Sequence, residues 1–229
     1  MKKKVIVISL GGSLIIPDKI NIKFLEQFKK TILKNKKNCK FVVVCGGGNI
    51  ARKYISALKS EKINEKMQGL SGIAATRTNA IFVSYFFNQN PEINIPINMK
   101  EVKSKLKKQS IVFCGALEYK PNQTSDATSA EIAHELKTIF INLTDIKGVY
   151  DKNPKKFKDA KFIPEISWKD FYKMANKLKF KPGKHFVLGQ TASKIIFKNK
   201  IPTYVLGKDL KQLDNFLNNK KFVGTRIEE

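Results

Sequence analysis

A run of β-branched residues that ends in glycines occurs twice in this chain, as Val5–Ser13 (VIVISLGGS) and as Phe41–Gly48 (FVVVCGGG). Such apolar runs are typical of strands buried on both faces of a parallel sheet. Glycines leave the backbone N–H groups of a turn open to a ligand, and the helix expected after the second turn adds its positive end. The two turns therefore predict two phosphate-binding loops. The alternative, two tight turns without a ligand, stays open.

Strand-like and helix-like segments alternate along almost the whole chain, in the βαβ order of a mostly parallel sheet covered by helices on both faces. The sequence therefore predicts one α/β domain over residues 1–229, with two lobes at most. We expect further strands at 91–99, 111–114, 138–143, 203–206 and near 222–227. We expect helices at 21–35, 49–58, 72–87, 126–136, 168–178, 191–198 and 210–217, with polar stretches at 60–68 and 145–164.

The formal net charge of +25 invites a nucleic-acid function, but the composition argues against a dedicated one. All but three of the 44 cationic residues are lysines, and they are spread through every segment. Recognition of phosphates and bases favours arginines gathered on one face, and the sequence shows no such cluster. Of the three arginines, Arg52 and Arg77 are candidates for positions that need a planar guanidinium.

The remaining composition is that of a cytoplasmic globular protein. No apolar run approaches the roughly 20 residues of a membrane helix, so no membrane association is expected. Cys39, Cys45 and Cys114 are odd in number and lack metal-ligand spacing, which is typical of reduced core thiols. His134 and His185 show no metal-type pairing and are expected in exposed or capping positions. The side chains therefore predict no metal site of their own.

Two polar loops after predicted strands, 115–126 and 144–153, are expected to join the glycine turns at one edge of the sheet, where α/β proteins bind ligands. In the first of them Thr124, Ser125 and Asp126 open a helix. These residues are either an N-cap cluster, or hydroxyl donors for phosphate beside a carboxylate that positions a cation or a catalytic lysine. Both interpretations stay open.

The second polar loop places Tyr150 near Thr144 and Asn153. Its ring either lines an adenine pocket or belongs to a turn punctuated by Asn-Pro. The chain contains no Gly-x-x-x-x-Gly-Lys-Ser/Thr, and the first glycine turn does not fit the dinucleotide fingerprint. The phosphate loops are therefore neither a P-loop nor a Rossmann turn.

The order of these motifs resembles the amino-acid-kinase superfamily and, within it, the archaeal-type uridylate kinases. Each motif is weak alone, but their order and spacing are specific, and they cover essentially the whole chain. They are GGS at 11–13, GGGNIARKY at 46–54, ATRTNA at 75–80, TSDA at 124–127, TDIKGVYDKNP at 144–154, ASKII at 192–196 and GTRIE at 224–228.

The resemblance implies a three-layer αβα sandwich that transfers the γ-phosphoryl group of ATP to UMP, with Mg²⁺ as the metal cofactor. It implies an acceptor-binding lobe at about 1–137 and an ATP-binding lobe at about 138–229. It also implies a homo-oligomer built from dimers, commonly a hexamer, and the apolar helix at 72–87 is the expected interface.

The resemblance also implies the roles of individual residues. Arg77 would either face the acceptor phosphate or form an ion pair between helices or subunits, and we favour the structural role. Lys194 would lie near the transferring phosphoryl group, with a solvated surface lysine as the alternative. The implied sets are Gly11, Gly12, Ser13, Gly48, Arg52, Thr144, Tyr150 and Asn153 for ATP, Gly47, Thr124, Ser125 and Asp126 for the acceptor, and Lys194, Asp126 and Arg52 for catalysis.

The chain departs from its apparent relatives at several of these positions. Relatives often carry lysine where this chain has Ser9 and Asn49, and aspartate where it has Asn153. An acidic residue that contacts the acceptor ribose would fall near Gly69, and the loop 115–123 lacks the His- and Gly-rich pattern of uridylate kinases. Two alternatives follow: a kinase for another phosphorylated acceptor, such as isopentenyl phosphate, or a nucleotide-binding protein without catalysis.

Overall fold

A computed structural model describes residues 3–90, 94–177 and 187–229. Its main sheet is parallel except where β8 meets β9, and a separate antiparallel pair joins β5 (Val149–Tyr150) to β6 (Phe162–Ile163). In spatial order the main sheet consists of β3 (Ile111–Cys114), β2 (Cys39–Cys45), β1 (Lys4–Leu10), β4 (Ile139–Leu143), β8 (Thr203–Leu206), β9 (Thr225–Ile227) and β7 (Glu165–Ile166).

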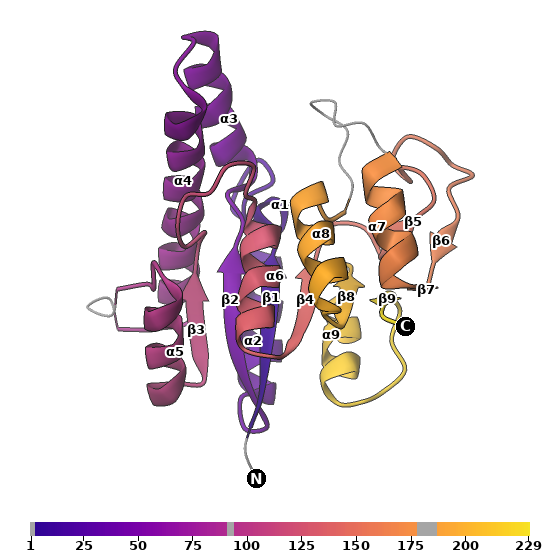
Figure 1. Cartoon of the computed structure of the whole chain (residues 1–229). Coiled ribbons are helices and arrows are strands. Elements are labelled where there is room, and N and C mark those ends of the chain that lie inside the picture. The colour runs from indigo at the N-terminus through magenta and orange to yellow at the C-terminus, as the bar shows by residue number, and fades with distance from the viewer. Residues whose placement is uncertain (1–2, 91–93, 178–186) are drawn as a thin grey trace.

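Helices cover both faces of this sheet, which makes the three-layer αβα sandwich that the sequence predicts (Figure 1). Neighbouring residues of a strand point to opposite faces, so Ile6 and Ile8 of β1 enter one core while Val7 enters the other. The first core also holds apolar residues of α1 (Gly12–Ile15), α2 (Ile22–Asn35), α4 (Glu65–Phe86) and α9 (Leu210–Leu217). The second holds those of α5 (Met99–Lys108), α6 (Ser125–Glu135), α7 (Trp168–Lys177) and α8 (Gln190–Asn199).

Two local predictions are wrong. The stretch 60–68, expected to be a polar connection, contains the start of α4, because Asn64 accepts a hydrogen bond from the Met67 N–H and caps the helix. Residues 94–98, expected to be a strand, are irregular and lead into α5, which Asn98 caps. The apolar pattern of that lysine-rich helix is short, because only two of its residues, Val102 and Leu106, are buried. Residues 91–93 of the expected strand, residue 178 of the expected helix 168–178 and His185 lie outside the described residues.

The prediction for the cysteines is confirmed. Cys39, Cys45 and Cys114 are free thiols in the sheet, and all three are buried. Burial raises the pKa of the Cys114 thiol to about 12, so this thiol stays protonated and unreactive. In the described part of the chain, no helix has the length and apolar character needed to cross a membrane.

Candidate active site

The two glycine turns interlock at the carboxyl edge of the sheet. Because β1 and β2 pair in register, with Leu10 opposite Cys45, both strands end at the same level. The Gly46 N–H donates to the Leu10 carbonyl over 2.9 Å. A Cβ added to Gly12 would lie 2.1 Å from the Gly48 nitrogen, so the two backbones touch where any side chain would separate them.

Helix α3 (Gly48–Ser60) begins inside the second turn and aims its amino end at this junction. Gly48 has a φ of +60°, a conformation that favours glycine. The N-cap is Gly47, which has no side chain to occupy the first N–H groups of the helix. Uncapped N–H groups at a helix start are suited to an anion, which supports the prediction of a phosphate site.

Helix α4 fixes the second turn from the side. The buried Asn79 amide donates to the Gly46 carbonyl over 2.7 Å, and the Thr76 methyl lies 3.4 Å from the position of a Cβ on Gly47. The sequence motif at 75–80 contains both residues, but nothing in the motif assigns them this role. Through these contacts the two side chains position the backbone of the turn. Neither of them is among the predicted ligand-binding residues.

Asp126 joins the polar loop 115–126 to β1. Its Oδ1 accepts a 2.7 Å hydrogen bond from the hydroxyl of Ser9, which is fully buried at the end of β1. Burial raises the pKa of Asp126 to about 6, and the Ser9 hydrogen bond works against that rise. Thr124 has the capping role, because its hydroxyl accepts from the Ala127 N–H over 3.2 Å. The capping interpretation therefore holds for Thr124, while the Asp126 side chain contacts the end of β1 and remains a candidate site residue.

The polar loop that begins at Gly115 is held by Arg77 of α4. The guanidinium donates from Nε to the Ala116 carbonyl over 3.2 Å and from Nη2 to the Leu117 carbonyl. Thr76 accepts from the Ala116 N–H over 2.9 Å. Arg77 thus has the structural role that the sequence favours, but within the described residues its partners are backbone carbonyls and not the expected carboxylate.

The polar loop 144–153 follows β4, and the end of β4 contacts the first glycine turn. The Gly11 N–H donates to the Leu143 carbonyl over 3.2 Å, and Thr144 follows directly. The Tyr150 ring packs edge-on against Phe162, with 5.5 Å between the ring centroids. The Asn153 side chain accepts from the Lys155 N–H over 2.9 Å, as the turn interpretation expects. The adenosine-binding role of this loop stays a prediction.

Of the other predicted site residues, Ser13 and Ser125 are half-buried, while Arg52 on α3 and Lys194 on α8 are both exposed. Lys194 lines a cavity of about 410 Å³ between α6 and α8, together with Lys120, Glu131 and His134. The structure therefore joins Asp126 to Ser9, two residues before the first glycine turn, whereas it places Lys194 among surface side chains of two helices.

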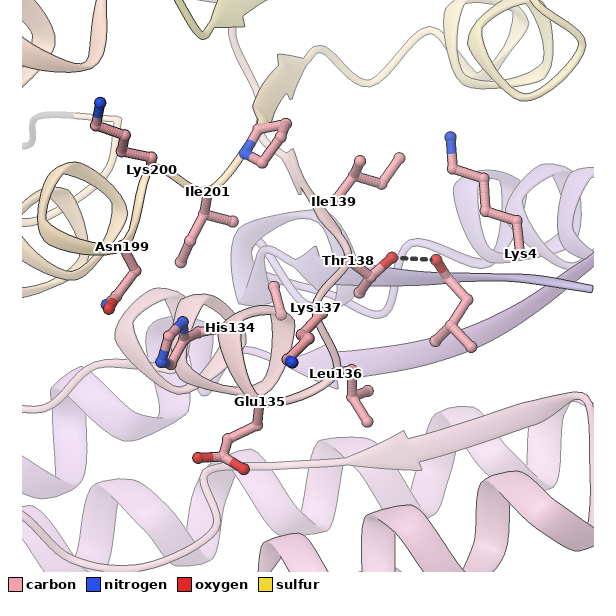
Figure 2. A pocket seen from close by; sticks show the side chains of 13 residues that line it. Lys4, His134, Glu135, Leu136, Lys137, Thr138, Ile139, Asn199, Lys200 and Ile201 are labelled. Carbon is pink, nitrogen blue, oxygen red and sulfur yellow. Dashed lines mark hydrogen bonds between the residues drawn. The ribbon is translucent and has the colours of Figure 1, made fainter.

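A larger cavity, of about 660 Å³, opens at the opposite edge of the sheet. Figure 2 shows Lys4, His134 and Thr138 around it, where Thr138 donates a hydrogen bond to the Val5 carbonyl. Lys4 and Thr138 stand at or just before the amino ends of β1 and β4. Ligands of α/β sheets bind outside the carboxyl ends, so this cavity is not the candidate site.

A mostly parallel sheet whose glycine turns, helix start and half-buried carboxylate meet at one edge defines an α/β protein with a candidate phosphate-binding site. The chain belongs to the amino acid kinase family, which it matches over residues 4–207. It is 37% identical to the uridylate kinase of Thermoplasma volcanium over 226 residues, covering 98% of this chain and 97% of that protein. It is 32% identical to the uridylate kinase of Thermoplasma acidophilum, covering 98% and 96%. The crystal structure of uridylate kinase from Archaeoglobus fulgidus superposes with a TM-score of 0.83 at 30% identity, covering 97% of this chain and 99% of that one.

Proposed function

We propose that this protein is a kinase that transfers the γ-phosphoryl group of ATP to UMP, giving ADP and UDP. The observation that carries the proposal is the interlock of two glycine turns beside Asp126, in a chain similar to uridylate kinases along nearly its whole length. Three free buried thiols support a cytoplasmic location for this activity.

In the proposed reaction an oxygen of the acceptor phosphate forms a bond to the γ-phosphorus, and the bond from that phosphorus to the β–γ bridging oxygen breaks. Gly11, Gly12 and Ser13 form the turn that binds the phosphates of ATP, through the N–H groups of Gly12 and Ser13, because the Gly11 N–H donates to the Leu143 carbonyl. Gly47 binds the acceptor phosphate. Asp126 orients the cationic groups that face the transferring phosphoryl group. Such fixed donors act where charge spreads in the transition state.

The other proposed contacts follow the division into an acceptor lobe at about 1–137 and an ATP lobe at about 138–229. Thr124 and Ser125 face the acceptor, while Gly48 and Arg52 face ATP from the opposite side of the junction. Thr144, Tyr150 and Asn153 surround the adenosine. In support, Thr124 and Gly48 stand at the starts of α6 and α3, and Thr144 follows β4 directly, all at the carboxyl edge of the main sheet.

The site fits a magnesium ion held mainly by the substrates. Among the described residues no group of three or more His, Cys, Asp or Glu gathers around one point, while Asp126 supplies one carboxylate beside the glycine turns. Mg²⁺ is commonly bound by one or two carboxylates plus substrate phosphates, which is the arrangement available here. When bound with ATP, Mg²⁺ neutralises charge on the phosphates.

The substrate is tested by coupled ADP release with UMP, CMP, AMP and isopentenyl phosphate, each at saturating Mg²⁺ and ATP. We expect UMP to give the highest kcat/KM. Preferred turnover of isopentenyl phosphate would assign the chain to the other acceptor class. Tight ATP binding without turnover of any acceptor would make it a nucleotide-binding protein without kinase activity.

The role proposed for Lys194 is tested against a neighbour on the same helix. Lys194 and Lys198 both line the cavity between α6 and α8, so they form a matched pair. If Lys194 reaches the transferring phosphoryl group, Lys194→Met lowers kcat by about 10²-fold, as loss of one transition-state donor does. Lys198→Met should leave kcat within about twofold. Equal, small effects of both changes would remove Lys194 from the mechanism.

We also propose a homo-oligomer that uses the exposed face of α4, a 22-residue helix along one side of the molecule (Figure 1). Met67, Leu70, Ile81 and Tyr85 are 55%, 45%, 37% and 48% exposed. Their spacing places them along one stripe of the helix. A contiguous apolar stripe of this kind marks a protein interface, and a second copy of this chain is the partner we propose.

The double variant Leu70→Asp/Ile81→Asp should therefore reduce the molecular mass in solution to that of a monomer, measured by analytical ultracentrifugation. Val223→Asp is the control, since Val223 is an apolar residue of similar exposure (50%) away from α4. An unchanged mass for the double variant, or an equal change for Val223→Asp, would contradict an interface at this helix.

A further inference from the structure

Tyr119 lies directly on the backbone of α4 at Gly69. A Cβ added to Gly69 would meet the Tyr119 ring at 2.5 Å from Cε2 and 3.0 Å from Cδ2. A side chain at position 69 and the ring in this place therefore exclude each other. The ring is only half-buried, so part of it faces the solvent beside the helix.

The loop that carries Tyr119 is anchored on both sides of it. Before Tyr119, Arg77 and Thr76 hold the backbone of Ala116 and Leu117. After it, the Lys120 ammonium pairs with Glu131 at 2.9 Å. Further along, the Gln123 amide donates to Glu131 over 2.8 Å, and the Thr191 hydroxyl donates to the Asn122 carbonyl over 2.9 Å. The ring is thus placed by contacts that do not involve the ring itself.

The ring shares a face of α4 with the residues that contact the second glycine turn. Gly69, Gly72 and Thr76 are spaced i, i+3 and i+7, which aligns them on one side of a helix. The Gly72 carbonyl and the Thr76 methyl lie 3.6 and 3.4 Å from the position of a Cβ on Gly47. Three to seven residues of helix rise about 5–10 Å, so Tyr119 stands about that far along α4 from the two contacts with Gly47.

We infer that Tyr119 is a specificity-determining residue of the acceptor site, and that its ring forms the wall against which the nucleoside end of the acceptor nucleotide packs. The inference rests on the proposed function, which places the acceptor phosphate at Gly47. A tyrosine ring offers a flat apolar surface to a base and limits the space for a second base ring. Because Gly69 has no side chain, it leaves the space that the Tyr119 ring occupies.

The test measures binding and turnover in the full chain with Tyr119→Ala, Tyr119→Phe, Gly69→Ala and the double variant Gly69→Ala/Tyr119→Ala. In Tyr119→Ala the affinity for UMP, measured by calorimetric titration, should fall at least about 10-fold. The affinity for a non-hydrolysable ATP analogue should change less than about twofold. Tyr119→Phe keeps the ring and should stay within about threefold of the wild type for UMP. The ratio of kcat/KM for UMP to that for AMP should fall at least about 10-fold in Tyr119→Ala.

Gly69→Ala should weaken UMP binding by displacing the ring, and it should add little when Tyr119 is already alanine. This non-additivity is the signature of a direct contact. Equal losses for UMP and the ATP analogue, or additive effects of the two changes, would overturn the inference. If the wild type prefers an acceptor other than UMP, the proposed substrate is wrong, and the same titrations with that acceptor decide the role of Tyr119.

Discussion

Replacing Asp126 with asparagine is expected to stabilise the free protein at neutral pH and to lower kcat by about 10²-fold or more. The pKa of Asp126 is raised by burial from 3.8 to about 6, so the folded state binds this proton more tightly than the unfolded chain does. The carboxylate therefore costs stability that appears as pH rises from about 4 to about 6 and persists above it. At 1.36 kcal/mol per pKa unit, the cost reaches at most about 3 kcal/mol. Asparagine keeps an oxygen that can accept the Ser9 hydrogen bond and removes the charge.

The measurement is urea unfolding of wild type and Asp126→Asn at pH 7 and at pH 4, with kcat determined at pH 7. The variant should be the more stable protein at pH 7, and the difference should shrink at pH 4, where Asp126 of the wild type is largely protonated. Asp18→Asn, at an exposed carboxylate, is the control and should alter neither stability nor kcat appreciably. If the variant were less stable than the wild type at pH 7, the charge of Asp126 would not destabilise the folded protein. If the variant were fully active, that charge would not be needed for catalysis.

The layers of the fold could be predicted because they rest on local patterns. Apolar runs such as Phe41–Cys45 mark strands buried on both faces, and the strand Thr203–Leu206 and the helix Leu210–Leu217 have the predicted bounds. The convergence of the glycine turns followed from the rule that parallel strands end at a common edge. The start of α4 and the whole of α5 were missed because asparagine caps and lysine-rich turns resemble loops in sequence.

The contacts within the site could not be predicted, because they join residues far apart in the chain. Ser9 and Asp126 are 117 positions apart, and neither residue indicates the other. Only the structure shows that the Ser9 hydroxyl donates a hydrogen bond to the half-buried carboxylate of Asp126. Gly69 likewise shows in sequence only that a side chain is absent. Only the packing reveals that Tyr119 fills the space.

Gly12→Ala, which adds a single methyl group where the two glycine turns interlock, should have a large effect on both stability and activity. In Gly12→Ala the new Cβ would lie 2.1 Å from the Gly48 nitrogen, 2.5 Å from its Cα and 2.7 Å from the Gly46 carbonyl oxygen. All three atoms are backbone, and the Asn79 hydrogen bond holds the second turn in place, so the clash is relieved only by moving the two turns apart. Overpacking of this kind costs about 1–3 kcal/mol or more.

Activity should be lost even in the protein that remains folded, because both proposed phosphate sites are formed by these backbones. A displacement of about 1 Å at a reacting centre costs about 10²-fold in rate, so kcat/KM for ATP should fall by at least that factor in protein that remains folded. Gly189→Ala is the matched control, because a Cβ at Gly189 meets no atom of the described residues within 4 Å. Chemical unfolding and ATP kinetics of the two variants decide the point. If Gly12→Ala behaved like Gly189→Ala in both measurements, the turns would not be in contact, and the ATP and acceptor phosphates would have to be bound by other parts of the chain.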